Sequence, residues 1–408
     1  MTNRVVVTGM AGITALGTEQ EQVWQGLRAK KNAVIRIDEW DKYDGLNTRL
    51  AAPILEFELP KHYTRKKIRS MGRVAKLSTR SSELALIQSG LIDEPALTDG
   101  RTGIAFGSST GSTGPVSAFA TMLLEHSTRN INANTYVAMM PHTTAVNTGL
   151  FFGLRGRVIP TSTACTSGSQ GIGYAYEAIK YGMQTAMVAG GAEELCPTEA
   201  AVFDTLFATS LKNSTPELSP RPYDQDRDGL VIGEGAGTLI LENAEFAKAR
   251  GATAIAELVG FASNCDAAHV TQPRAETMQI CMEMALKDAG LSPADISYVN
   301  GHGTATELGD IAETTATHRL FGSQTPLSSL KSYFGHTLGA CGAIEAWLSL
   351  CMLQRNWYAP TLNLDNIDSR CGELDYIRGE GRVLDCEFVM SNNFAFGGIN
   401  TSMIFKKL

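Results

Sequence analysis

Short runs of β-branched and small residues alternate along the chain with longer segments in which hydrophobic positions recur every three or four residues. Runs of the first kind are typical of buried strands, and segments of the second kind are typical of helices. Their alternation predicts an α/β fold. The runs expected to form strands are Val5–Gly9, Thr102–Gly107, Val158–Thr163, Thr185–Ala189, Gly237–Leu241, Ile255–Ala262, Ile296–Asn300, Pro326–Ser329, Phe388–Ser391 and Thr401–Phe405.

Helical patterns lie between these strands, for example at Glu276–Ala289 and Ala340–Leu353. The segment Asn243–Gly251 reads as a helix that carries Lys and Arg and ends at a glycine, and the alternation of strands and helices restarts after it. We therefore divide the chain into an N-terminal half, 1–250, and a C-terminal half, 251–408. The sequence shows no repeat between the two halves.

The composition of the 408 residues, with 43% hydrophobic, 19% charged and 7% aromatic, is that of an ordinary globular protein. The formal charge of −7 gives no positive field over the whole chain, so a nucleic-acid partner is not expected. The first residues lack the regions of a signal peptide, and no apolar run approaches the ~18–20 residues that cross a bilayer. We expect a cytoplasmic protein without a membrane span.

The 8 cysteines and 7 histidines are scattered singly, without CxxC or HxxxH spacing. Such spacings mark zinc sites, and sets of paired cysteines mark disulfide frameworks. We therefore expect no metal and no disulfide, with most cysteines acting as buried small hydrophobic residues in a reducing compartment.

Cys165 stands out by its context, because it follows a predicted strand and precedes the helical pattern of Ile172–Tyr181, with small residues around it. A thiol at such a strand-to-helix turn has room for an incoming acyl group, and the N-terminus of the helix lowers its pKa. An isolated cysteine is more often a buried structural residue. Here the context favours a nucleophile.

Two histidines occur in similar surroundings. His302 follows an apolar strand and lies between two glycines, and His336 follows another predicted strand, beside a glycine and five residues after Lys331. A lone histidine is usually structural. Two such histidines in a chain with a candidate nucleophile favour a shared catalytic site.

A basic cluster stands in the less periodic segment Ile35–Lys76 and contrasts with the acidic chain. Taken alone, it is interpreted as a solvated helix face, and the alternative is a docking surface for an acidic partner. Its members are Arg65, Lys66, Lys67, Arg69, Arg73 and Lys76.

Together these motifs resemble one family over essentially the whole chain: the β-ketoacyl-acyl-carrier-protein synthases, elongating condensing enzymes of fatty-acid and polyketide synthesis in the thiolase superfamily. The Glu193–Cys196 stretch is most similar to type I synthases, and the turn at Cys165 to type II synthases. The segments that carry the resemblance are Thr163–Ser167, Gly190–Cys196, Arg221–Asp224, Arg227–Gly229, Gly233–Gly237, Tyr298–Asp310, Lys331–Ala343 and Phe394–Gly398.

The resemblance implies a thiolase-like, five-layered αβαβα fold of two related halves, and a homodimer. It implies that Cys165 accepts an acyl chain from the phosphopantetheine thioester of an acyl carrier protein, with no other cofactor. The backbone N–H groups of Cys165 and Phe396 would form an oxyanion hole, and Phe396 would gate the acyl pocket. A decarboxylative Claisen condensation with malonyl carrier protein would follow.

The resemblance also implies roles for single side chains. His302 and His336 would hydrogen-bond the malonyl thioester oxygen and stabilise the enolate as CO₂ leaves, and Lys331 would support the charge arrangement. Thr304 and Thr306 match positions that hold the pantetheine arm.

Carrier proteins are strongly acidic and dock on a positive patch in this family. The resemblance therefore changes the interpretation of part of the basic cluster, which we now expect to be a docking patch. The residues of this docking patch are Arg65, Lys66, Lys67 and Arg69.

Three alternatives share the fold. A degradative thiolase would need a second cysteine near its C-terminal glycine-rich loop, and Asn392–Asn400 contains none. A starter-type or chalcone-like synthase would use Cys, His and Asn, whereas the third position here is His336. A non-catalytic chain-length factor, the partner of a ketosynthase in a heterodimer, would lack the nucleophile, and Cys165 with both histidines argues against it.

Several positions depart from the family pattern. The gate loop has Asn393, Ala395 and Ile399 where Ser, Gly and Thr are common, and Thr110 replaces an aliphatic residue of the acyl pocket. A Cβ at Ala395 restricts the swing of Phe396 unless the loop has relaxed around it. The changes leave two pathways open: fatty-acid elongation, and a specialised pathway such as aryl polyene or polyketide synthesis.

Overall fold

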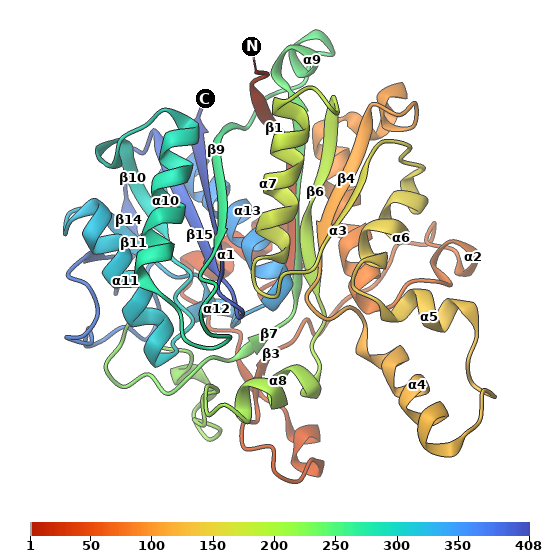
Figure 1. Ribbon diagram of the computed structural model, residues 1–408, viewed down its shortest axis with the longest axis horizontal. Helices are drawn as coiled ribbons and strands as arrows, with labels where there is room; N and C mark the ends of the chain where they lie inside the picture. Colours follow the sequence, from red (N-terminus) through yellow and green to blue (C-terminus); the bar gives the residue numbers. More distant parts are fainter. Residues whose placement is uncertain (1) are drawn as a thin grey trace.

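A large mixed sheet forms the centre of the protein in the computed structural model, which describes residues 2–408 (Figure 1). In their order across the sheet the strands are β13 (Asp375–Tyr376), β11 (Pro326–Ser328), β10 (Ile296–Asn300), β15 (Phe388–Phe394), β16 (Ile399–Lys407), β9 (Ala256–Cys265), β1 (Val5–Thr14), β8 (Gly235–Asn243), β6 (Ala186–Glu193), β4 (Thr102–Gly107) and β5 (Val158–Thr161). The two halves of the chain meet in the middle, where β1 pairs with β9 only from Val5 to Val7.

Both halves build the same strand arrangement. Counted outward from the β1–β9 junction, the N-terminal half runs β1, β8, β6, β4, β5, and the C-terminal half runs β9, β16, β15, β10, β11. In each half the first two pairings are antiparallel and the next two are parallel. The halves are structural repeats although their sequences show none, which confirms the expected thiolase-like fold of two related halves.

Helices cover both outer faces of the sheet and fill the space between the two halves. The helices are α1 (Gln20–Arg28), α2 (Arg65–Ile68), α3 (Arg73–Ser89), α4 (Thr113–Glu125), α5 (Ala133–Met139), α6 (Thr143–Phe152), α7 (Ser167–Lys180), α8 (Pro197–Asp204), α9 (Ala244–Ala249), α10 (Ala275–Ala289), α11 (Glu307–Phe321), α12 (Lys331–Phe334) and α13 (Cys341–Arg355). α3 packs on β1 and β8, α10 packs on β9 and β16, and α7 and α13 pack against each other between the halves. This gives the five layers.

The middle layer explains an unusual stretch of sequence. Every residue of α13 from Cys341 to Leu353 is buried, because strands of both halves and α7 surround this helix. A helix that is apolar around most of its circumference is expected at such a position, and Glu345 and Ser349 are the polar exceptions in this stretch. Two small sheets complete the fold: β2 (Ile35–Arg36) with β3 (Leu50–Ala52) and β7 (Ile232–Gly233), and β12 (Trp357–Tyr358) with β14 (Arg382–Val383).

All ten predicted strands are present, and the four predicted helical segments correspond to α7, α9, α10 and α13. Several boundaries were wrong: β1 continues past Gly9 to Thr14, and β6 continues past Ala189 to Glu193. The strand expected to end at Thr163 ends at Thr161, and α7 begins at Ser167 rather than Ile172. The first turn of α7 consists of small residues because it packs on backbone. A Cβ on Gly168 would lie 2.9 Å from the carbonyl oxygen of Gly339. The division at residues 250 and 251 falls between α9 and β9 and stays a prediction.

α4 and α5 project from the body at the lower right of Figure 1, and neither helix has a buried residue. They precede β5, which forms the open edge of the N-terminal half of the sheet. Among residues 2–408, no helix is both long and apolar enough to cross a membrane.

Candidate active site

Cys165 lies in the turn between β5 and α7. Ala164 holds the left-handed part of this turn with φ 50°, a conformation that costs roughly 1–2 kcal/mol for a residue with a Cβ. The Ser167 hydroxyl fixes the turn, because it donates to the Ala164 carbonyl at 2.6 Å and accepts from the Thr163 N–H at 2.9 Å. The sulfur is thereby held at the carboxyl end of a parallel strand, where α/β folds bind ligands.

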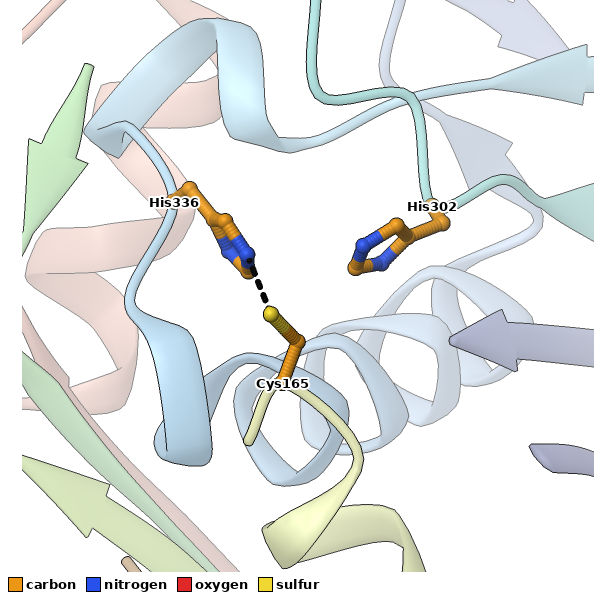
Figure 2. A group of neighbouring side chains, drawn as sticks. All are labelled: Cys165, His302 and His336. Atoms are coloured by element: carbon orange, nitrogen blue, oxygen red, sulfur yellow. Dashed lines mark hydrogen bonds between the residues drawn. The ribbon is translucent and has the colours of Figure 1, made fainter. Parts of the chain in front are cut away.

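The histidines reach Cys165 from the C-terminal half. His302 follows β10 and His336 follows α12, and Figure 2 shows their rings on either side of the sulfur. His336 Nε2 lies 2.9 Å from Cys165 Sγ, and the two imidazole centroids are 5.2 Å apart with the rings at 89°. The sulfur and one nitrogen of each ring lie within 4.8 Å of one another. The structure thus brings the three predicted residues together.

The thiol is protonated near neutral pH. Burial raises the pKa of Cys165 to about 11, although the backbone N–H groups of Phe396 and of Cys165 itself and the charge of Lys331 favour the thiolate. The expectation of a lowered thiol pKa was therefore wrong for the unacylated protein, because desolvation outweighs the helix N-terminus. The sulfur needs a base before it can attack, and His336 Nε2 is in position to be that base.

Both imidazoles are neutral near pH 7. Burial and the charge of Lys331 lower the pKa of His302 and His336 well below the usual value of 6.5. The side-chain amide nitrogen of Asn393 lies 3.4 Å from His302 Nδ1, and because that nitrogen can only donate, Nδ1 accepts and Nε2 carries the proton. His302 therefore offers an N–H donor from Nε2.

Lys331 is close enough for its charge to lower the pKa of both histidines, and it is 1% exposed. Its ammonium forms an ion pair with the buried carboxylate of Glu345. Asn393 donates to the other oxygen of this carboxylate at 2.7 Å, so Asn393 connects the ion pair to His302. Sequence reasoning noted Asn393 only as a departure from the family pattern and missed this connection.

Buried carboxyl groups fix the loop that carries His302. Glu313 accepts from the backbone N–H groups of His302 and Gly303, and Asp310 accepts from the N–H of Ala305, which has φ 64°. Bonds of this kind hold a loop in a conformation that its own sequence does not favour.

Two cavities meet at Cys165. The larger cavity has a volume of about 420 Å³, and the smaller cavity, of about 350 Å³, reaches α8. The hydroxyls of the predicted pantetheine residues Thr304 and Thr306 lie 2.9 Å apart at the wall of the larger cavity. Lys331 lines neither cavity. The predicted site residues that line the larger cavity are Cys165, His302, Thr304, Thr306, His336 and Phe396.

Phe396 contributes to the walls of both cavities, which is the place expected for a gate. Its ring packs edge-on against Phe203, with centroids 5.4 Å apart. Gly397 and Gly398 adopt φ of 89° and 75°, whereas Ala395 lies outside the left-handed region. The left-handed backbone that glycine favours therefore occurs at the two residues after Phe396. Ala395 does not strain the loop in this conformation.

The docking patch does not reach the site. Arg65, Lys66 and Lys67 lie on α2 and Arg69 follows it, and all four are exposed. Arg73 from the same cluster forms an ion pair with the buried Glu234 and is not part of this free charge.

A thiol and two imidazoles are also ligands that Zn²⁺ accepts, and the expectation of a metal-free site stays a prediction.

Two family models match the chain. The model of the β-ketoacyl synthase N-terminal domain matches residues 2–247, and that of the C-terminal domain matches residues 255–365. The 3-oxoacyl-[acyl-carrier-protein] synthase 2 of Vibrio harveyi is 37% identical over 414 residues, which cover 99% of each protein.

Solved structures agree with this. A β-ketoacyl synthase from Burkholderia phymatum STM815 is 59% identical and covers 100% of both chains with a TM-score of 0.98. A ketosynthase structure described as a type II polyketide synthase acyl-carrier protein in complex with its hexaketide-bound ketosynthase is 29% identical, with full coverage and a TM-score of 0.88. With matching family models over most of its length and a full-length relative above 30% identity, this chain belongs to the β-ketoacyl synthase family.

Proposed function

We propose that this chain is an elongating β-ketoacyl-acyl-carrier-protein synthase, which condenses an acyl chain on Cys165 with malonyl carrier protein. The observation that carries the proposal is the approach of Cys165, His302 and His336 to within 4.8 Å where two cavities meet. The test is incubation of the purified chain with acyl and malonyl carrier proteins, and detection of the 3-oxoacyl product by mass spectrometry. A protein that is acylated but forms no product would contradict the proposal.

In the first half-reaction, His336 Nε2 takes the proton of Cys165, and the thiolate attacks the acyl thioester. The oxyanion would lie against the N–H groups of Cys165 and Phe396. Both N–H groups already favour negative charge on the sulfur, which supports this role. The bond from the carbonyl carbon to the pantetheine sulfur breaks, and that sulfur takes the proton from His336.

In the second half-reaction, the pantetheine arm of malonyl carrier protein would enter the larger cavity past Thr304 and Thr306. His302 would donate a hydrogen bond from Nε2 to the malonyl thioester oxygen, and His336 would donate one in the tautomer that carries its proton on Nε2. The bond to the carboxylate breaks, CO₂ leaves, and its electron pair forms the enolate. The enolate carbon attacks the thioester on Cys165, and the sulfur leaves as a thiolate, which takes a proton from solvent by way of His336.

A non-catalytic chain-length factor is the second candidate, and no observation favours it. Such a subunit would not need a nucleophile and a base in contact, whereas the His336 Nε2 to Cys165 Sγ distance is 2.9 Å. Transfer of a labelled acyl group from carrier protein to the chain separates the two functions.

The docking patch would bind the acidic carrier protein. We expect Lys66→Glu with Arg69→Glu to raise KM for carrier-protein substrates roughly tenfold and to weaken its salt dependence, because complementary charge steers encounter. Small pantetheine thioesters should react as before. The control is Lys248→Glu, which reverses an exposed charge on α9. It should leave KM unchanged for both kinds of substrate. Equal losses with both substrate types would contradict a docking role.

A second copy of this chain would cover the projecting arm. α4 and α5 expose Leu123, Leu124 and Tyr136, which are 69%, 81% and 52% accessible, and β5 offers an unpaired edge at the end of the large sheet. We expect a homodimer by light scattering. Leu124→Asp should shift it toward monomer, and an unchanged mass would place the interface elsewhere.

The chain would work in the cytoplasm, with no cofactor beyond the pantetheine arm. All eight cysteines are free in the described part of the chain, as is typical of a reducing compartment. Elemental analysis of active protein tests the absence of a metal.

A further inference from the structure

Glu199 is a buried acid that the proposed chemistry does not use. It lies in the first turn of α8 and is 5% exposed, and neither of its carboxyl oxygens has a hydrogen-bond partner within residues 2–408. The backbone N–H of Cys196 favours the charged form only weakly and does not reach hydrogen-bond geometry. Buried polar groups are nearly always paired, so this carboxyl needs a partner from outside the chain as described.

Two neighbouring acids show that this part of the fold can satisfy a buried carboxyl. Glu193 accepts from the hydroxyls of Ser108 and Ser109 and from the N–H of Gly339. Glu194 accepts from the N–H and the hydroxyl of Thr113, both at 2.8 Å. Glu199 alone of the three is left without partners.

Glu199 lines the smaller cavity, which also contains Cys165 and Phe396. The other walls include the apolar side chains of Val202, Phe203 and Leu338. Among the described residues that line this cavity, Glu199 is the only one with an ionisable carboxyl group. An acyl chain bound to Cys165 and extending past Phe396 would occupy this space.

Burial and neighbouring acids favour the neutral form of this carboxyl. Burial raises its pKa well above the usual value, and the nearby Glu193, Cys196 and Glu194 raise it further. A neutral carboxyl offers one O–H donor and one carbonyl acceptor. A saturated alkyl chain would leave both groups unpaired, whereas an oxygen on the chain would pair with them.

We propose that Glu199 selects acyl chains that carry a hydroxyl or keto oxygen, by hydrogen-bonding that oxygen in the smaller cavity. This inference rests on the proposed acylation of Cys165. A hydroxyl can donate to the carboxyl or accept from it, while a keto oxygen can only accept, so a hydroxylated chain matches the site in more ways. Thr110 also lines the smaller cavity. It stands where the family often has an aliphatic residue, so its hydroxyl adds a further polar group to the cavity wall.

The test measures the rate at which Cys165 is acylated, by mass spectrometry of the intact protein. The probes are carrier proteins loaded with octanoyl chains that are unsubstituted, or that bear a hydroxyl or a keto group at successive carbons from the fourth outward. For at least one position we expect wild type to take the oxygenated chain roughly 10–100-fold faster than octanoyl, the scale of leaving a buried polar group unpaired. The hydroxyl and keto series show which oxygen is preferred.

Glu199→Leu removes both polar groups while keeping a side chain of similar size. It should accelerate octanoyl transfer and slow transfer of the oxygenated chain, so that the preference disappears or inverts. Glu199→Gln keeps a donor and an acceptor and should retain the preference. The matched control is Val202→Leu, which changes the shape of the same cavity and should alter the rates for both chains by the same factor.

Three outcomes would overturn the inference. Equal wild-type rates for all chains would mean that Glu199 is paired in some other way, for example by a second copy of this chain. A preference that survives Glu199→Leu would place the selecting group elsewhere. Equal slowing of both chains by Glu199→Leu would show a structural role. Absence of any acylation of wild type would instead contradict the proposed function, and is thus distinguishable from these results.

Discussion

Replacing Cys165 with alanine should abolish formation of the 3-oxoacyl product, because without the sulfur no acyl thioester can form. The fold should survive, since a small side chain that is 4% exposed is replaced by a slightly smaller one. Product formation and acylation are measured by mass spectrometry, and the fold by thermal unfolding. Condensation near the wild-type rate in a folded variant would remove Cys165 from the mechanism.

Cys165→Gln separates the two half-reactions. The neutral amide of the glutamine resembles the carbonyl of the acyl-enzyme. His302 and His336 should therefore take the arrangement that they have when Cys165 is acylated. We expect CO₂ release from malonyl carrier protein to continue, with no condensation. The readout is CO₂ release beside the 3-oxoacyl product. If Cys165→Gln loses CO₂ release while Cys165→Ala keeps it, the glutamine side chain blocks the larger cavity.

The sequence predicts the elements of this fold better than it predicts their relation to one another. Strands such as Thr102–Gly107 and Ile296–Asn300 are continuous apolar runs because both of their faces are covered, and their bounds are as predicted. The duplication of the two halves could not be predicted in this way. Equivalent strands share topology but not sequence, so the duplication becomes visible only when the pairings of β1 and β9 are known.

For the site, a strand-to-helix turn and two glycine-flanked histidines were enough to predict which residues meet. Their protonation states were not predictable in the same way. The pKa of Cys165 depends on how deeply the sulfur is buried and on the charge of Lys331, which are properties of the packed molecule. Local sequence reports the helix N-terminus but not the desolvation that outweighs it.

Residues that act through long-range contacts were missed for the same reason. Asn393 binds Glu345 and approaches His302, and these three residues come from different segments of the chain. Glu199 lies within a helix whose sequence gives no sign that both carboxyl oxygens lack partners. The only sequence signal available for Asn393 was its departure from the residue common in the family.

His302→Ala and His336→Ala should each slow decarboxylation of malonyl carrier protein by about 10²–10³-fold, the usual effect of removing one donor to a developing oxyanion. Both side chains are neutral, so each loss removes a hydrogen bond rather than a positive charge. CO₂ release is measured in the Cys165→Gln background, so that acylation does not contribute. Loss in only one variant would assign the enolate to a single histidine.

Acylation should distinguish the same two variants. His336 Nε2 contacts the sulfur at 2.9 Å, whereas His302 has no hydrogen bond to it, so only His336→Ala should slow acylation, by about 10²–10⁴-fold at pH 7. With a thiol pKa of about 11, the thiolate fraction at pH 7 is about 10⁻⁴ once the base is gone.

The dependence on pH has a definite sign. Because the lost base must be replaced by direct ionisation of the thiol, acylation of His336→Ala should rise about tenfold per pH unit between pH 7 and pH 9. Wild type and His302→Ala should stay nearly flat over this range, since His336 is already neutral at pH 7 and above. Stopped-flow acylation with a small pantetheine thioester measures this without carrier-protein docking. A flat profile for His336→Ala would mean that another group takes the proton of Cys165.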